Sequence, residues 1–318
     1  MSFFKRLFSP KAVAVPKSGK PDNTLGFEQI LLFTGLAEKG DFPTLEEAYR
    51  TAPWHEQSLI IEGLANQPDA QANLLEAWMG KRPDAHLPFL LMGAILTKEA
   101  WDARSSKLAK DVSPEQASAF FDLLKSARAA LMEAIERDGN DPQCYSRMLP
   151  VLMGLEEEEE VLMAYFRQAK TLVPSHLGAH MAMLNALTPK WGGSHEQMDT
   201  FLTTYCDVKT WPLLTGVHLS AMLEKWIQLN FDGQEEAFRT YFDDAQRKQT
   251  VLALYKAYTD PENVGLQTYI TRNYFALLLI RTGEKELARQ EIRKLEGRMT
   301  MMPWKLVGIH NYATLSRL

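Results

Sequence analysis

Hydrophobic and polar residues follow a helical rhythm along most of the chain. From Leu25 onward, apolar residues recur at spacings of three and four, and strictly alternating, strand-like runs are scarce. Gly, Pro and Asp interrupt this pattern every 10–18 residues. The pattern predicts an all-α protein, with helices at about 25–38, 44–51, 54–66, 70–80, 86–97, 114–138, 142–154, 156–172, 175–187, 194–206, 212–229, 233–246, 248–258, 262–282, 284–297 and 303–316.

Local signals mark where several of these helices begin. A Ser or Thr followed three residues later by Glu or Gln allows each side chain to cap the backbone amide of the other. Such pairs are Thr44/Glu47, Ser113/Gln116 and Ser194/Gln197. Proline in the first helical position is equally favourable, because no partner exists there for the amide it lacks. We expect this arrangement at Ser113-Pro114, Asp141-Pro142 and Asp260-Pro261.

Helices of this length, joined by short polar turns, favour stacked antiparallel hairpins over a single bundle. Two segments match the 34-residue tetratricopeptide pattern of small and large apolar positions. The first carries Leu149, Met153, Phe166 and Ala169 before Pro174, and the second carries Phe275, Ala276, Gly283, Ala288, Ile292 and Leu295. The chain thus resembles tetratricopeptide-like or Sel1-like helical-repeat proteins. The resemblance implies a solenoid of about eight hairpins, most regular near 114–206.

A second resemblance rests on the string L-x-P-K-W-G-G-S at residues 187–194. It looks like a signature of uncharacterised bacterial proteins with tetratricopeptide-like helices, and it extends over about 114–206. The resemblance implies a bacterial, cytoplasmic helical-repeat protein and brings no catalytic residues with it.

In a tetratricopeptide-like solenoid, certain positions of the first helix of each hairpin line a concave groove that binds a peptide or a partner helix. The resemblance assigns these positions to Arg147, Val151, His176, Ala179, Met183, Asn273 and Leu277. We add His180, which shares a helix face with His176, and Lys190 and Trp191, which lie in the turn at 187–194, as further candidates for contact with a partner.

The charge of the chain excludes some functions and divides the molecule. The 318 residues carry a net charge of −5, so no strong positive field exists to attract nucleic acid. Residues 1–24 hold five positive charges and one negative, which leaves −9 on residues 25–318. We expect a basic, disordered arm at 1–24 and a helical-repeat domain at 25–318, with a subdivision near 207–211. Two cysteines, Cys144 and Cys206, exclude a disulfide scaffold and indicate a reducing compartment.

The start of the arm has a second interpretation. Phe3, Phe4, Leu7 and Phe8 would share one side of a short helix beside Lys5 and Arg6, as in weak membrane-surface anchors. Pro10, Lys11 and Pro16 interrupt any secretory signal, and no apolar stretch approaches the roughly 20 residues that span a bilayer. The sequence predicts a cytoplasmic protein, with weak membrane-surface contact through residues 1–10 as the alternative.

Candidate chemistry in the body is sparse. His176 and His180 share a helix face at a spacing that suits two metal ligands, but the sequence places no third ligand, so we expect no metal and no cofactor. The segment from Pro189 to Ser194 reads as a tight turn, and alternatively as an anion site in which Lys190 supplies the charge. The Glu156–Glu160 run reads as a solvated helix face, and alternatively as a docking patch for a basic partner.

These observations predict a non-enzymatic scaffold or adaptor that recognises a protein or peptide and no nucleic acid. Two alternatives remain open. One is an immunity or antitoxin-like protein whose acidic body neutralises a basic toxin domain. The other is an enzyme or anion-binding protein centred on the turn from Lys190 to Ser194.

Overall fold

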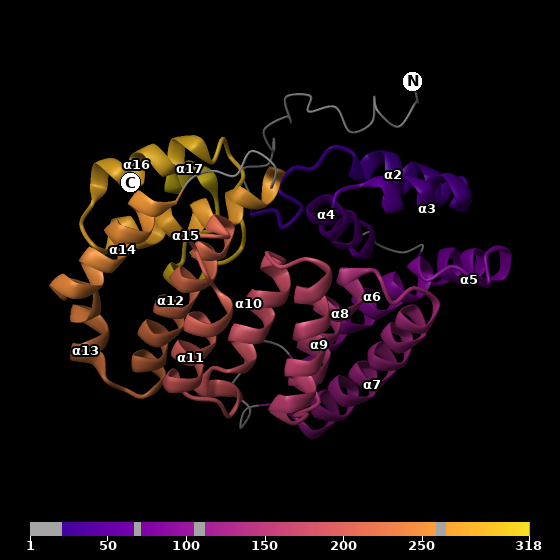
Figure 1. Ribbon diagram of the computed structural model, residues 1–318, viewed down its shortest axis with the longest axis horizontal. Helices are drawn as coiled ribbons and strands as arrows, with labels where there is room; N and C mark the ends of the chain where they lie inside the picture. Colours follow the sequence, from indigo (N-terminus) through magenta and orange to yellow (C-terminus); the bar gives the residue numbers. More distant parts are fainter. Residues whose placement is uncertain (1–20, 67–70, 105–111, 259–264, 318) are drawn as a thin grey trace. The chain divides into compact units, whose positions relative to one another are not determined.

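A computed structural model describes residues 21–66, 71–104, 112–258 and 265–317. Every regular element within these ranges is a helix, which confirms the all-α prediction (Figure 1). Most of the basic arm and the predicted Asp260-Pro261 helix start lie outside the described residues. No helix in the described ranges is long and apolar enough to cross a lipid bilayer.

The described chain forms two compact units. Unit 1 comprises residues 28–183, and unit 2 comprises residues 184–317 together with 21–27. The division falls between Met183 and Leu184, upstream of the 207–211 segment that the sequence indicated. It lies inside one helix, so no Pro, Gly or change of composition marks it in the sequence.

Unit 1 is built from helices that pack in consecutive pairs and across them. The helices are α2 (Ile30–Glu38), α3 (Phe42–Thr51), α4 (Trp54–Ala65), α5 (Gln71–Lys81), α6 (Leu87–Arg104), α7 (Pro114–Arg137), α8 (Pro142–Gly154), α9 (Glu159–Leu172) and the start of α10 (Leu177–Ala186). The α6–α7, α7–α8 and α8–α9 pairs pack side by side, as Figure 1 shows. However, α4 contacts α2, α3, α6 and α8, so the packing extends beyond sequential hairpins.

Unit 2 has shorter and more irregular elements. They are η2 (Pro189–Trp191), α11 (His195–Tyr205), η3 (Pro212–Leu214), α12 (Thr215–Phe231), α13 (Glu235–Thr240), η4 (Tyr241–Asp243), α14 (Ala245–Ala257), η5 (Gly265–Gln267), α15 (Thr268–Arg281), α16 (Lys285–Lys294), η6 (Trp304–Val307) and α17 (Tyr312–Leu315). The helix α15 packs on α12, α14 and α16 and is almost wholly buried. It is the central element of this unit.

Several predicted helix boundaries need correction. The helix predicted at 44–51 begins at Phe42, because the Asp41 carboxylate caps it by accepting the Thr44 amide. Thr44 therefore lies inside the helix and does not cap it. The helix predicted at 303–316 is two short turns separated by Gly308, whose φ of 71° ends the first. The Ser113/Gln116 box and the Asp141 cap form as predicted, because both depend only on residues within one turn.

Residues 21–24, the last part of the predicted arm, belong to unit 2. The Asp22 amide donates to the Met299 carbonyl at 2.8 Å, and the Asp22 carboxylate accepts the amides of Thr24 and Gly26. Leu25 is fully buried directly after them. These contacts attach the beginning of the described chain to the segment after α16, so residues 21–24 belong to the folded part of unit 2 although the charge pattern assigned them to the arm.

Candidate binding pocket in unit 1

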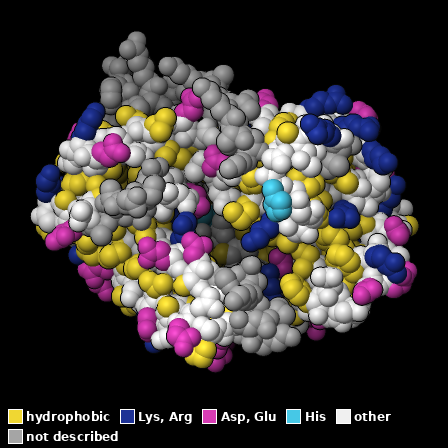
Figure 2. All heavy atoms as spheres, turned by 180° about the vertical axis from the view of Figure 1, so that it is seen from behind, with side chains coloured by type: hydrophobic (Ala, Val, Ile, Leu, Met, Phe, Trp, Pro, Cys, Tyr) yellow, Lys and Arg dark blue, Asp and Glu magenta, His cyan; other side chains and the backbone are white. Residues whose placement is uncertain are grey.

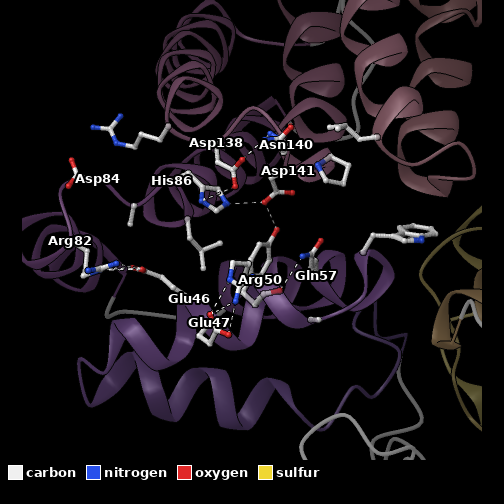
Figure 3. A pocket seen from close by; sticks show the side chains of 18 of the residues that line it. Glu46, Glu47, Arg50, Gln57, Arg82, Asp84, His86, Asp138, Asn140 and Asp141 are labelled. Carbon is white, nitrogen blue, oxygen red and sulfur yellow. Dashed lines mark hydrogen bonds and ion pairs between the residues drawn. The ribbon is translucent and has the colours of Figure 1, made fainter. Parts of the chain in front are cut away.

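A pocket of about 710 Å³ opens in unit 1 where five segments meet. It is bounded by α3, the start of α4, the turn before α6, the turn between α7 and α8, and the end of α9. Figure 3 shows charged side chains from these segments converging on it. Its ionisable lining residues are Glu46, Glu47, Asp84, Asp138, Asp141, Arg50, Arg82, Arg137, His86 and Tyr49.

Asp141 connects three of these segments. Its Oδ1 accepts the Gln143 amide at 2.8 Å and so caps α8. Its Oδ2 accepts the Tyr49 hydroxyl from α3 at 2.8 Å and Nε2 of His86 at 3.0 Å. The side chain is only 4% exposed, so these three donors replace the water that a buried carboxylate would otherwise need. The cap signal at Asp141 was visible in the sequence, but its two distant partners were not.

The contacts with Asp141 determine which atoms of Tyr49 and His86 carry a hydrogen. Burial, followed by the negative charge of Asp141, raises the pKa of Tyr49 well above its usual value, so the phenol keeps its proton and donates it. A carboxylate can only accept, so Nε2 of His86 carries the hydrogen in its contact with Asp141. Nδ1 of His86 lies 3.9 Å from Oδ2 of Asp138. The imidazole therefore stands between two carboxylates.

The arginines of the pocket are already paired. Arg82 bonds to Glu46 at 2.9 Å and Arg50 bonds to Glu47 at 2.7 Å, both within the lining. Arg137 pairs with Glu133 and lies over the Phe89 ring, 4.0 Å from its centroid. Five carboxylates thus face three guanidinium groups whose charges are already neutralised. The uncompensated charge of the pocket is negative. Asp138 and Asp141 flank His86, whereas Asp84 lies apart from them on the side of Arg82, as Figure 3 shows.

An aromatic side chain forms another part of the lining. Trp54, the first residue of α4, is half-buried. Its ring meets that of His55 edge-on at 5.6 Å and that of His176 at 4.9 Å. Its carbonyl accepts Nε2 of Gln143 from α8 at 2.9 Å. These contacts hold the start of α4 against α8 and the segment before α10, so the ring is fixed in place.

The residues of unit 1 that the tetratricopeptide resemblance assigned to a groove lie mostly in the interior. Val151, His176, Ala179, His180 and Met183 are each at most 1% exposed. The amide of Ala179 donates to Nδ1 of His176, and Nδ1 of His180 lies 2.9 Å from the His176 carbonyl. Burial, followed by the neighbouring His180, lowers the pKa of His176 to about 3, so its imidazole is neutral.

Arg147, the remaining groove candidate of unit 1, is partly buried. Its guanidinium donates to the Ser58 carbonyl at 3.3 Å and lies 3.6 Å from the Glu62 carboxylate. Within the described ranges, no group of three His, Cys, Asp or Glu side chains has the arrangement needed to hold a metal ion. His176 packs against Trp54 and His180 packs against Phe166.

The turn at 187–194 in unit 2 has the tight geometry that its sequence suggested. Gly192 has a φ of 87°, and a Cβ on Gly193 would lie 2.2 Å from the Leu187 carbonyl oxygen. Ser194 caps α11 by accepting the Gln197 amide. Lys190 bonds to Glu224 at 2.8 Å, which neutralises the charge that an anion site would use. Trp191 is half-buried in this turn.

Asn273 and Leu277, the candidates on α15, are also buried. Nδ2 of Asn273 donates to the carbonyls of Tyr269 and Arg298, and its Oδ1 accepts the Thr300 amide and the Trp304 indole. All four of its hydrogen-bonding positions are used. Asn273 therefore joins α15 to the segment after α16. The tetratricopeptide resemblance assigned it to a groove, because the sequence did not reveal that it lies in the interior.

On the face drawn in Figure 2, side chains of both charge signs are exposed, with Lys and Arg more frequent toward one side and Asp and Glu toward the other.

Comparison with known families adds one finding. Residues 34–159 match the family described as "Domain of unknown function (DUF4034)". This segment contains the whole pocket lining except Leu172 and Val173. A search of the curated proteins found no match. The matched segment lies entirely within unit 1, the unit that carries the pocket.

Proposed function

We propose that the protein is a non-enzymatic interaction module whose unit 1 binds a positively charged segment of a partner protein. The observation that carries the proposal is the pocket around His86, in which carboxylates outnumber guanidinium groups and each guanidinium already has an acidic partner. A cation entering such a site meets uncompensated negative charge, whereas an anion would first have to break an existing ion pair.

The distribution of charge along the chain supports the same proposal. Residues 28–183 contain 24 Asp and Glu against 14 Lys and Arg, a net charge of −10. Residues 184–318 contain 15 and 16, so the acidic excess of the body belongs to unit 1. A negative field around the pocket would speed the approach of a basic segment and reject acidic ones.

The test compares three peptides on the full-length protein. Fluorescein-labelled Gly-Ser-Lys, Gly-Ser-Arg and Gly-Ser-Glu sequences, each repeated three times, are titrated by fluorescence anisotropy at 50 and 300 mM NaCl. We expect the two basic peptides to bind and the acidic peptide to fail, with basic affinity falling by about tenfold or more at high salt. Absence of basic-peptide binding, or preferential binding of the acidic peptide, overturns the proposal.

Matched variants locate the binding. The double variant Asp84→Asn, Asp138→Asn removes two carboxylates of the lining with little change of shape. We expect it to weaken basic-peptide binding about 5–30-fold, as for the loss of two partly exposed charge contacts. The control is Asp122→Asn on α7, which removes an exposed carboxylate outside the lining. If the double variant and Asp122→Asn bind the basic peptides with equal affinity, the peptides bind outside the pocket.

An immunity-like protein that neutralises a folded basic domain is the narrower alternative. It is favoured by acidic residues of unit 1 outside the pocket, where Glu158, Glu159 and Glu160 are exposed at the start of α9. Glu157 differs, because it pairs with Arg128. If this alternative holds, replacing Glu158, Glu159 and Glu160 by Lys abolishes capture of the partner, whereas Asp84→Asn with Asp138→Asn leaves capture unchanged.

A further inference from the structure

We infer that the bound cation is a primary ammonium, as on a lysine side chain, whose nitrogen donates to both Nδ1 of His86 and Oδ2 of Asp138. The inference rests on the proposed function and adds the position and the chemistry of the cation. A ligand at this position needs its N–H groups as well as its charge.

Both atoms belong to side chains that line the pocket, and both can accept a hydrogen bond. Nε2 of His86 carries the hydrogen that Asp141 accepts, so Nδ1 of the neutral imidazole has a lone pair. Oδ1 of Asp138 accepts the Asn140 amide at 2.9 Å. Among the described residues, no group donates a hydrogen bond to Nδ1 of His86 or to Oδ2 of Asp138. The two side chains are 19% and 40% exposed, so a ligand in the pocket reaches these acceptors.

The spacing of the two acceptors fits one nitrogen between them. They are 3.9 Å apart, and Figure 3 shows the His86 ring and the Asp138 carboxylate side by side. A nitrogen about 2.8–2.9 Å from each atom donates to both at an angle of about 85–90°. The N–H bonds of an ammonium diverge by about 109°, so each hydrogen bond deviates from linearity only slightly. The parallel N–H groups of a guanidinium instead match the two oxygens of one carboxylate, which lie closer together.

Other contacts fix both acceptors before a ligand binds. The Asn140 amide holds the carboxylate of Asp138, which is the C-cap residue of α7. Asp141 holds His86 at 3.0 Å and is itself held by the Tyr49 hydroxyl. The carbonyl groups at the end of α7 carry partial negative charge, which favours a cation beside Asp138. Acceptors that are already in position lower the entropic cost of binding.

The other carboxylates near His86 are placed differently. Asp141 is 4% exposed and already accepts three hydrogen bonds, so it contributes charge without a free acceptor. Asp84 lies apart from His86, on the side of Arg82 (Figure 3). Asp84 and Asp138 therefore form a matched pair, because they line the same pocket with the same charge and only Asp138 lies beside His86.

The first experiment changes the ligand and leaves the protein unchanged. The lysine peptide described above and the same peptide trimethylated at each lysine Nζ carry equal charge, but the trimethylated nitrogen has no hydrogen to donate. Both are titrated on the full-length wild-type protein by fluorescence anisotropy at 50 mM NaCl and pH 8, where an imidazole in water is neutral. We expect trimethylation to weaken binding about tenfold or more. Equal or tighter binding of the trimethylated peptide overturns the inference.

The second experiment compares Asp138→Asn with Asp84→Asn. The first substitution replaces Oδ2 by an amide nitrogen that can only donate, because Oδ1 remains the acceptor for Asn140. We expect Asp138→Asn to weaken binding of the lysine peptide about 5–30-fold and Asp84→Asn by less than about threefold. Circular dichroism and thermal melting establish that each variant is folded. Equal weakening by the two substitutions overturns the inference.

A third variant removes the other acceptor without changing the charge. In His86→Gln the amide nitrogen can still donate to Asp141, but nothing replaces Nδ1. We expect it to weaken the lysine peptide about 5–10-fold at pH 8. Unchanged affinity in folded His86→Gln overturns the inference. If a variant does not fold, the comparison of the two peptides on wild-type protein decides.

The outcomes separate the inference from the proposed function. If trimethylation has no effect, or if the arginine peptide binds more tightly than the lysine peptide, the ammonium site is wrong and the cation-binding pocket stands. Failure of both the lysine and the arginine peptide to bind overturns the proposed function itself.

Discussion

The hydroxyl of Tyr49 donates a 2.8 Å hydrogen bond to Oδ2 of Asp141, although 92 residues separate the two along the chain. The same carboxylate caps α8 and accepts His86, so one side chain joins α3, the turn before α6 and the start of α8. This cross-link is buried in the lining of the pocket. The shape of the candidate site therefore depends on a polar contact in the core of unit 1.

Removing the hydroxyl tests the cross-link. Tyr49→Phe leaves the ring in place and deprives a buried carboxylate of one donor, so we expect unfolding to become easier by about 1.5–3 kcal/mol. The control is Tyr145→Phe, whose hydroxyl donates to the Gly139 carbonyl at an exposed site and should cost less than about 1 kcal/mol. Urea denaturation followed by circular dichroism compares them, and equal midpoints for Tyr49→Phe and wild type would contradict the prediction.

Alanine substitutions at two adjacent glycines of unit 2 should lower the stability of the protein by different amounts. A Cβ on Gly192 meets nothing within 4 Å, so Gly192→Ala suffers only from its positive φ, at about 1–2 kcal/mol. A Cβ on Gly193 would lie 2.2 Å from backbone oxygen of Leu187, so Gly193→Ala should cost about 3 kcal/mol or more. Thermal melting of both variants provides the measurement. A smaller loss for Gly193→Ala than for Gly192→Ala would contradict this account of the turn.

Asn273 should be among the most sensitive positions of unit 2. Asn273→Ala leaves the Trp304 indole and the Thr300 amide without their acceptor in the interior, and we expect a loss of about 3 kcal/mol or more. Trp304 fluorescence should shift to longer wavelength as the segment after α16 loosens. The comparison is Asn311→Ala, which removes the cap of the short helix α17 at an exposed site and should cost about 1 kcal/mol. Similar effects of the two variants would argue against the proposed connection.

A half-buried carboxyl in unit 1, that of Glu56, predicts that stability depends on pH. Burial raises the pKa of Glu56 to about 7. The folded state therefore binds more protons than the unfolded state between pH 4.5 and 7, and stability falls as pH rises through this window. Glu56→Gln should stabilise the protein at pH 8 by about 1–2 kcal/mol, because the side chain is partly solvated, and should be neutral near pH 4. Urea midpoints at both pH values measure this, and an equal effect at the two would contradict it.

Two buried histidines act in the opposite direction. Burial lowers the pKa of His55 to about 4, and burial with the neighbouring His180 lowers that of His176 to about 3. The unfolded state then binds more protons below pH 6.5, so their contribution to stability is lost as pH falls toward these values. Replacing both histidines by Gln should flatten the decline of the urea midpoint between pH 6 and 4.5. An unchanged slope would show that other groups control acid unfolding.

The helical class and many helix ends were open to prediction because they depend on neighbours in the sequence. The capping box of Ser113, the cap at Asp141 and the turn at Gly192 and Gly193 each involve residues within about one helical turn. The periodicity of apolar residues likewise reports only which face of a helix is buried. The tetratricopeptide resemblance was used to predict which residues face a groove, and this depends on how distant helices pack. It assigned Val151, His176 and Asn273 to the groove, although the fold buries them.

The pocket belongs to the part that only the tertiary structure decided. Tyr49, His86 and Asp141 lie on separate segments, and nothing in the spacing of residues that are 55 and 92 positions apart indicates contact. The same holds for Trp54 and His176, and for the pairing that neutralises Arg82 and Lys190. The physical reason is that a single sequence records local backbone preference and burial, whereas the charge and shape of a site arise when distant helices pack and determine which side chains neutralise each other.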